Sequence, residues 1–251
     1  YDKKLAIDLG ADGFILKQAD WSECLLERLA RVIEDRILVK FWGVRGTLPA
    51  PGPHTVRYGG NTSCITLDLP NGQFFIFDAG TGIKALSNEL LANGRAKRFE
   101  AKLFISHPHW DHINALPFFA PLYIQGGEIE ILGPAQQDVP MEKIISDQMD
   151  GVYFPIKIRE FAARVHFRDL GEEHLNLRRV SVATMLLSHP GNCLGYRVNY
   201  KDRSFCYVTD NELYPSDSEF HNRGYFEHLA QFCQAADVLV TDATYTDAEY
   251  Q

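Results

Sequence analysis

Three histidines and one aspartate fall within six consecutive residues of this chain, as His107, His109, Asp111 and His112. Neutral imidazole nitrogens and carboxylate oxygens are the ligands that zinc, manganese and iron(II) accept, and a short loop can aim several of them at one point. The chain has only nine histidines in 251 residues. Composition alone would give this order and spacing roughly once in a thousand cases. The stretch therefore predicts a metal site rather than a polar loop.

The residues before this loop predict a strand that would hold it in place. The run Lys-Leu-Phe-Ile at 102–105 is apolar enough for a buried strand. Pro108 then stiffens the loop, because its own φ is fixed and it restricts the backbone of the residue before it. We therefore expect the histidines to lie on a stiff turn at the end of a buried strand.

The series His-x-His-x-Asp-His at 107–112 resembles the metal-binding motif of the metallo-β-lactamase-fold hydrolase superfamily. The resemblance implies that His107 and His109 hold one divalent metal ion, while Asp111 and His112 hold a second. Zinc is the ion that we expect, with manganese and iron as alternatives. Two such ions activate a hydroxide held between them. The resemblance gives Asp111 a catalytic role in orienting or deprotonating that water.

Two more ligands are implied by the resemblance, and suitable residues follow in the expected order. A histidine should come after a strand, and the strand-like run 179–184 leads through a short apolar segment to His189. An aspartate that bridges the metals should end another strand, and Asp210 follows the run 204–209. The implied ligand set is therefore His107, His109, Asp111, His112, His189 and Asp210.

A last histidine ligand is implied near the C-terminus, after a further strand and helix. Beyond His189 the sequence has only His221 and His228, and both precede the apolar run 238–240. We expect this ligand to lie beyond Gln251, so that the chain is truncated at its C-terminal end. We also expect His107, His109 and His189 to hold their metal ion more tightly than the second site holds its own.

Three glycine-containing motifs upstream resemble the phosphodiesterase and ribonuclease Z-like branch of the superfamily. They are Phe-x-Gly-x-Arg-Gly-Thr at 41–47, Gly-Gly-Asn-Thr-Ser at 59–63 and Phe-Asp-Ala-Gly-Thr-Gly at 77–82. Two roles are open to Asp78, which lies in the third motif. It either supports a ligating histidine by accepting the second ring N–H, or it caps the helix that follows.

The chain becomes rich in strand-like runs from about residue 37 onward. These runs fall into two groups separated by helical segments, which indicates an α/β protein. The resemblance makes residues 37–251 one hydrolase domain with the metallo-β-lactamase αββα sandwich, lacking its C-terminal end. Residues 134–176 carry the weakest signals, with a helix predicted only at 141–146. We interpret His166 in that region as structural or surface-exposed.

Residues 1–36 differ from the rest and form a short α/β segment. The stretch Gly-Ala-Asp-Gly-Phe-Ile-Leu-Lys at 10–17, followed by an amphipathic helix, resembles the last third of a response-regulator receiver domain. On that resemblance, Lys17 matches the lysine that senses a phosphorylated aspartate. The alternative is an ordinary linker helix. A receiver tail would imply that the hydrolase domain is regulated by phosphorylation upstream.

Composition and charge narrow the range of partners. A chain with 45% hydrophobic and 23% charged residues is an ordinary globular protein, and its net charge of −8 does not favour general attraction to nucleic acid or anionic membranes. No apolar run approaches the roughly 20 residues that span a bilayer, and no signal peptide opens the chain. Five widely spaced cysteines without a C-x-x-C pair indicate reduced thiols and a cytoplasmic protein.

The metal core is compatible with both phosphodiester and acyl hydrolysis. Our first interpretation is a phosphodiesterase that acts on a small phosphodiester or nucleotide, because the upstream motifs resemble that branch. Nucleic acid ranks lower as a substrate because the chain is acidic. The alternatives are an acyl hydrolase of the lactonase, thioesterase or lactamase type, and a non-catalytic signalling or ligand-sensing module. We also allow for a homodimer.

Overall fold

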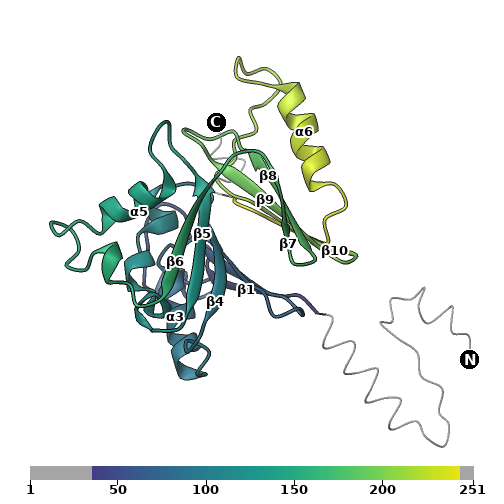
Figure 1. Cartoon of the computed structure of the whole chain (residues 1–251). Coiled ribbons are helices and arrows are strands. Elements are labelled where there is room, and N and C mark those ends of the chain that lie inside the picture. Colours follow the sequence, from purple (N-terminus) through teal and green to yellow (C-terminus); the bar gives the residue numbers. More distant parts are fainter. Residues whose placement is uncertain (1–35, 244–251) are drawn as a thin grey trace, which may run out of the picture.

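The computed structural model describes residues 36–243, which form two stacked β-sheets with helices on their outer faces (Figure 1). The receiver-like stretch at 10–17, with Lys17, lies outside the described residues. Within residues 36–243, the order of layers is helix, sheet, sheet, helix. The predicted α/β sandwich is therefore confirmed.

The first sheet contains six strands in the order in which they occur along the chain. Its first three strands pair antiparallel, and the remaining strands run parallel to β3. Parallel strands end at the same edge of a sheet, so the loops that follow β3, β4 and β5 meet there. The strands are β1 (Leu38–Gly43), β2 (Cys64–Asp68), β3 (Phe74–Phe77), β4 (Glu100–Phe104), β5 (Glu128–Pro134) and β6 (Arg164–Leu170).

The second sheet has five strands in the order β11-β10-β9-β8-β7. Neighbouring strands pair antiparallel except β10 and β11, which are parallel. Its strands are β7 (His174–Leu177), β8 (Val180–Leu186), β9 (Leu194–Tyr200), β10 (Arg203–Val208) and β11 (Val238–Thr241).

Helices cover the outer face of each sheet. Helices α3 and α5 pack on the first sheet, and α6 packs on the second, where Leu229 is its buried anchor. The α-helices are α3 (Gly82–Ala92), α4 (Trp110–Ile113), α5 (Met141–Gln148) and α6 (Arg223–Cys233). Short 3₁₀ turns occur at η1 (Pro53–Thr55), η2 (Leu116–Phe118), η3 (Ala120–Tyr123) and η4 (Ile158–Glu160).

An aromatic cluster fills the space between the two sheets. Phe77 at the end of β3 is fully buried. Its ring centroid lies 5.4–5.7 Å from the rings of Phe104, Tyr196, Phe205 and Tyr207. Three of these four rings belong to the second sheet, so Phe77 joins the two sheets directly. Aromatic pairs at such distances contribute about 0.5–1.5 kcal/mol each beyond the burial of their surface.

Two strands were not predicted from the sequence, and both lie at sheet edges. β6 and β7 fall in the region 134–176 and just after it, where only the helix at 141–146 was predicted. β6 has the sequence Arg-Val-His-Phe-Arg-Asp-Leu, with mostly exposed charged positions. Such charged edge strands protect a sheet against pairing with other chains, and they carry little apolar signal. His166 lies on β6 and is exposed, as expected.

The described residues give two further observations on the environment of the protein. No helix among them is both long and apolar enough to cross a membrane. The described cysteines are free thiols, and three of them (Cys64, Cys193 and Cys206) are buried, in agreement with the prediction of reduced cysteines.

Replacing Phe77 by alanine tests whether the aromatic cluster joins the sheets. We expect Phe77→Ala to lower the free energy of unfolding by about 3–5 kcal/mol, because it leaves a cavity among four rings. Phe226→Ala is the matched control, since this side chain is 52% exposed on α6, and we expect a change below about 1 kcal/mol. Urea unfolding followed by circular dichroism measures both. Similar losses for the two variants would contradict the assignment.

Candidate metal centre

The six predicted ligands lie together at one edge of the sandwich, where the connections after β4, β8 and β10 meet. The loop after β4 and the short helix α4 carry four of the residues, while His189 follows β8 and Asp210 follows β10. Within the described residues, five of the six form two groups, in each of which the ligand atoms lie within 4.8 Å of one another. One group is His107, His109 and His189, and the other is His107, His112 and Asp210.

The three-histidine group has the geometry that a first-row metal needs. His109 Nδ1 lies 2.9 Å from His107 Nε2 and 3.0 Å from His189 Nε2. Around a tetrahedral zinc ion with Zn–N distances of about 2.0–2.1 Å, ligand nitrogens are separated by about 3.3 Å. The rings would therefore need to move apart by only a few tenths of an ångström. The donor set fits zinc, and manganese or iron(II) also accept imidazole.

The second group combines one imidazole with carboxylates. His112 Nε2 lies 3.0 Å from Asp210 Oδ2 and 3.4 Å from Asp111 Oδ2. Asp111 does not belong to this second group, but its carboxylate lies beside His112 Nε2, the nitrogen that also faces Asp210. The same nitrogen and oxygens would suit a divalent ion at this position. The roles of these residues as ligands remain a prediction.

Asp78 supports the second group from behind. Its carboxylate is completely buried, and it lies 2.7 Å from His112 Nδ1. It also accepts hydrogen bonds from the amide and hydroxyl of Ser106, at 2.7 and 2.9 Å, and from the hydroxyl of Tyr207 at 2.6 Å. The helix α3 begins after Thr81, not Asp78. Of the two predicted roles, the structure therefore places Asp78 in the one that orients a histidine.

Ser106 extends this support to His107. The hydroxyl of Ser106 donates to Asp78, and its oxygen lies 3.1 Å from His107 Nδ1. The thiol of Cys193 lies 3.6 Å from the same ring nitrogen. A hydrogen on His107 Nδ1 can donate to Ser106, which leaves Nε2 free to face His109. One buried carboxylate therefore orients two of the predicted ligands.

Asp111 is fixed by the motif at 41–47, an interaction that sequence reasoning missed. The amide of Thr47 donates to Asp111 Oδ2 at 2.7 Å. Burial alone would raise the pKa of Asp111, but the hydrogen bonds from His112 and Thr47 hold its pKa below the usual value. Asp111 is therefore ionised at neutral pH. An ionised carboxylate suits a metal ligand or a proton acceptor, but not a proton donor.

A second missed network holds the two distant ligands relative to each other. The amide of Ser188 donates to the hydroxyl of Tyr225 at 2.9 Å and to Asn211 Oδ1 at 3.2 Å, and the Tyr225 hydroxyl donates to Asn211. Ser188 precedes His189, and Asn211 follows Asp210. Tyr225 from α6 thus connects the backbone amide next to His189 with the side chain next to Asp210. These residues have no local motif that would have revealed them from the sequence.

The histidines divide into neutral and charged in the protein without metal. Burial and the neighbouring charge of His112 lower the pKa of His107 to about 2, and burial also lowers the pKa of His189. Burial acts in the same direction on His112, but the carboxylates of Asp78, Asp111 and Asp210 raise its pKa well above the usual value. At neutral pH, His112 is therefore protonated, whereas His107 and His189 are ready to bind metal.

Comparison with known proteins agrees with this fold. Residues 74–251 match the beta-lactamase superfamily domain, so the chain belongs to this superfamily. Ribonuclease Z of Bacillus thuringiensis (strain Al Hakam) is 31% identical over 160 residues, which cover 62% of this chain and 49% of that protein. Ribonuclease Z of Bacillus anthracis (strain CDC 684 / NRRL 3495) matches to the same extent. The chain spans about half the length of the curated relatives it matches.

Solved structures show the same fold at lower identity. The metallo-β-lactamase fold protein YhfI from Bacillus subtilis has a TM-score of 0.57 at 16% identity, covering 84% of this chain and 73% of that one. Human tRNase Z, short form, has a TM-score of 0.54 at 22% identity, covering 84% and 79%. A diphosphatase from the PhnP family has a TM-score of 0.53 at 17% identity, covering 81% and 73%.

Replacing Asp78 by asparagine tests the support of the histidines. We expect Asp78→Asn to weaken zinc binding by about 10–100-fold, because the amide keeps the shape but loses the charge that orients His112. Competition with a chromophoric chelator measures the affinity. Asp68→Asn serves as the control, since Asp68 pairs with Arg95 on the surface. An unchanged affinity in Asp78→Asn would show that Asp78 does not orient the ligands.

The protonation of His112 predicts a pH dependence of metal binding. Below the raised pKa of His112, a metal at this group must displace a proton, so its affinity should increase about tenfold for each unit of rising pH. The three-histidine group should depend less on pH, because the pKa values of His107 and His189 are lowered and these two rings have no proton to lose. Calorimetry in buffers of different ionisation enthalpy measures the protons released. Equal proton release for the first and second metal equivalents would contradict this division.

Proposed function

We propose that this chain is a metal-dependent hydrolase that cleaves phosphodiesters. The observation that carries the proposal is the convergence of four imidazoles and two carboxylates at one sheet edge, in a chain whose curated relatives at 31% identity are named Ribonuclease Z. Structural support for the ligands comes from a buried carboxylate and from two hydrogen-bond networks. Such construction favours a working metal centre over an incidental cluster of histidines.

The predicted ligands fall into two sets, one for each metal ion. His107, His109 and His189 would hold one divalent ion, and His112, with Asp111 beside it, would hold the second, with Asp210 between the two. Bound there, two such ions would supply an activated water and neutralise charge on the phosphate oxygens. Zinc is the ion that this donor set favours, with manganese and iron as alternatives.

Asp111 is the residue that we assign to proton transfer. It is ionised at neutral pH, its Oδ2 is held by the amide of Thr47, and it lies 3.4 Å from His112 Nε2 of the second group. From this position it would orient the attacking water and accept its proton. No serine or cysteine nucleophile is required, and the nearby thiol of Cys193 is unsuited to that role because burial raises its pKa.

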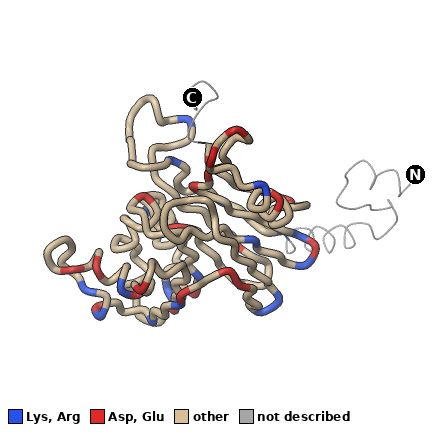
Figure 2. Tube along the Cα trace, turned by 90° about the horizontal axis from the view of Figure 1, so that it is seen from above, with Lys and Arg blue, Asp and Glu red and all other residues tan. Residues whose placement is uncertain are grey.

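A small phosphodiester or a nucleotide is the substrate class that we favour. The net charge is −8, and basic and acidic positions are interspersed along the described trace (Figure 2). A long nucleic acid binds through many lysine and arginine contacts to phosphate, and this distribution offers few such contacts. A small substrate depends mainly on the metal centre and the loops around it.

RNA is the second candidate, and a specific observation supports it. The curated relatives named Ribonuclease Z share 31% identity over 160 residues, which cover 62% of this chain. Both classes present a phosphodiester to the metals, so the ligand set does not separate them. Gating by a receiver domain remains a prediction, since the receiver-like segment lies outside the described residues. Formation of a homodimer also remains a prediction.

Turnover of a chromogenic phosphodiester tests the proposed reaction. We expect the protein reconstituted with zinc or manganese to hydrolyse bis(p-nitrophenyl) phosphate and to lose this activity on chelation. We expect Asp111→Asn, assayed at saturating metal, to lower kcat by about 10²–10⁴-fold, the usual contribution of a general base. Asp202→Asn, an exposed carboxylate on the β9–β10 turn, is the matched control and should be unchanged.

Parallel assays distinguish the alternatives. Faster hydrolysis of p-nitrophenyl acetate or a lactone would move the assignment to an acyl hydrolase. Faster cleavage of a short RNA than of a cyclic nucleotide would favour the ribonuclease. No turnover of any of these substrates with both metals bound would leave a ligand-sensing module as the explanation.

A further inference from the structure

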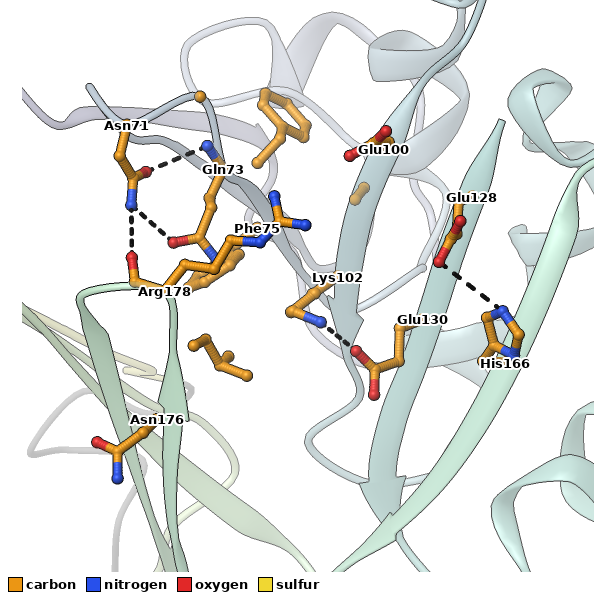
Figure 3. Close-up of a pocket in the computed structure, with 14 residues that line it drawn as sticks. Asn71, Gln73, Phe75, Glu100, Lys102, Glu128, Glu130, His166, Asn176 and Arg178 are labelled. Atoms are coloured by element: carbon orange, nitrogen blue, oxygen red, sulfur yellow. Dashed lines mark hydrogen bonds and ion pairs between the residues drawn. The ribbon is translucent and has the colours of Figure 1, made fainter. Parts of the chain in front are cut away.

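A cavity of about 460 Å³ opens between the two sheets at the end opposite the metal centre (Figure 3). One wall is formed by the first residues of β4, β5 and β6, and the other by the turns between β2 and β3 and between β7 and β8. β4 runs from Glu100 at the cavity toward His107. At about 3.3 Å per residue, the two are separated by roughly 20 Å. The cavity is therefore distinct from the metal centre.

The wall formed by the first sheet is charged where a core would be apolar. In the strand register, Glu100 lies opposite Glu128, and Lys102 lies opposite Glu130, which in turn lies opposite His166. All five side chains line the cavity. Further along β4 and β5, the equivalent positions are filled by the core residues Phe104 and Leu132. The face thus changes from apolar to charged at the point where the cavity begins.

Most of these charges are neutralised within the wall, and one is not. Lys102 pairs with Glu130 in a half-buried ion pair, and Arg164 pairs with Glu128 at 2.5 Å. Among the residues that the structure describes, the carboxylate of Glu100 forms no hydrogen bond or ion pair. A single uncompensated negative charge therefore remains on this wall.

The opposite wall presents a free cation. Arg178 lies in the turn between β7 and β8, where Asn71 donates to its carbonyl at 3.1 Å and ties the turn to the neighbouring β2–β3 hairpin. Figure 3 shows the guanidinium of Arg178 extending across the cavity toward β4, which carries Glu100 and Lys102. Within residues 36–243 this guanidinium has no hydrogen-bond or ion-pair partner. Phe75 and Leu177 add apolar surface between the two walls.

We propose that this cavity binds a free amino acid with an apolar side chain. Its amine would pair with Glu100, its carboxylate would accept hydrogen bonds from the Arg178 guanidinium, and its side chain would lie against Leu177 and Phe75. Charge-assisted hydrogen bonds of this kind are stronger than neutral ones, and arginine suits the planar shape of a carboxylate. The volume is within the range of about 300–1,000 Å³ that is usual for small-molecule sites.

The arrangement of charges disfavours ligands that carry only an anionic group or only an amine. A ligand with only an anionic group would leave Glu100 unpaired and would face the three glutamates of the strand wall. A ligand with only an amine would leave the Arg178 guanidinium without a partner. A zwitterion satisfies both groups at once, as complementarity at a binding site requires.

Three ligands of nearly equal size test the proposal by isothermal titration calorimetry on the intact chain at neutral pH. They are L-phenylalanine, 2-phenylethylamine, which lacks the carboxylate, and 3-phenylpropionate, which lacks the amine. We expect saturable binding of L-phenylalanine and about tenfold or weaker binding of the other two, because each lacks one charge-assisted contact. We expect Glu100→Gln and Arg178→Gln each to weaken binding of L-phenylalanine by about tenfold or more.

The controls separate a lost contact from a damaged fold. Glu219→Gln removes an exposed charge elsewhere and should bind as the unchanged protein does. Both cavity variants should keep the thermal midpoint and the turnover of the chromogenic phosphodiester, because neither residue belongs to the metal centre. Absence of saturable binding by L-phenylalanine, equal binding of the amine alone, or full binding by both variants would each overturn the proposal.

Discussion

The buried carboxylate of Asp78 is the interaction on which the metal centre depends. It accepts hydrogen bonds from the amide and hydroxyl of Ser106, from His112 and from the hydroxyl of Tyr207. These partners come from the loop after β4, from α4 and from the second sheet. A buried charge is tolerated only when its oxygens are hydrogen-bonded. Its backbone is also held at a φ of 61°, a conformation that costs about 1–2 kcal/mol outside glycine.

The electrostatics of the site follow from this arrangement. Three carboxylates surround His112, so that it keeps a proton, and the charge on His112 in turn helps to keep His107 neutral. Without metal, the proton on His112 balances part of the negative charge of Asp111 and Asp210. A divalent ion at the same place would take over that role. The cluster is thus electrostatically prepared for a cation even before one binds.

The ligands of the site could be predicted from the sequence, whereas their supports could not. The segment 107–112 holds four predicted ligands within six residues, so a local motif is sufficient. Tyr207 reaches Asp78 across 129 residues of sequence, and Tyr225 reaches Ser188 across 37. Such contacts arise from the pairing of strands and the packing of α6, and no local pattern records them. For the same reason, the edge strand β6 was missed: its charged residues face solvent rather than a core.

The aromatic cluster between the sheets separates the charged cavity from the metal centre. On β4, alternate side chains enter the space between the sheets, first Glu100, then Lys102 and then Phe104. Phe104 stacks on Phe77, with ring centroids 5.4 Å apart, and this cluster closes the gap between the sheets. A small molecule in the charged cavity therefore has no passage to the metal ligands. Any influence of one end on the other would have to pass through the strands themselves, most directly along β4.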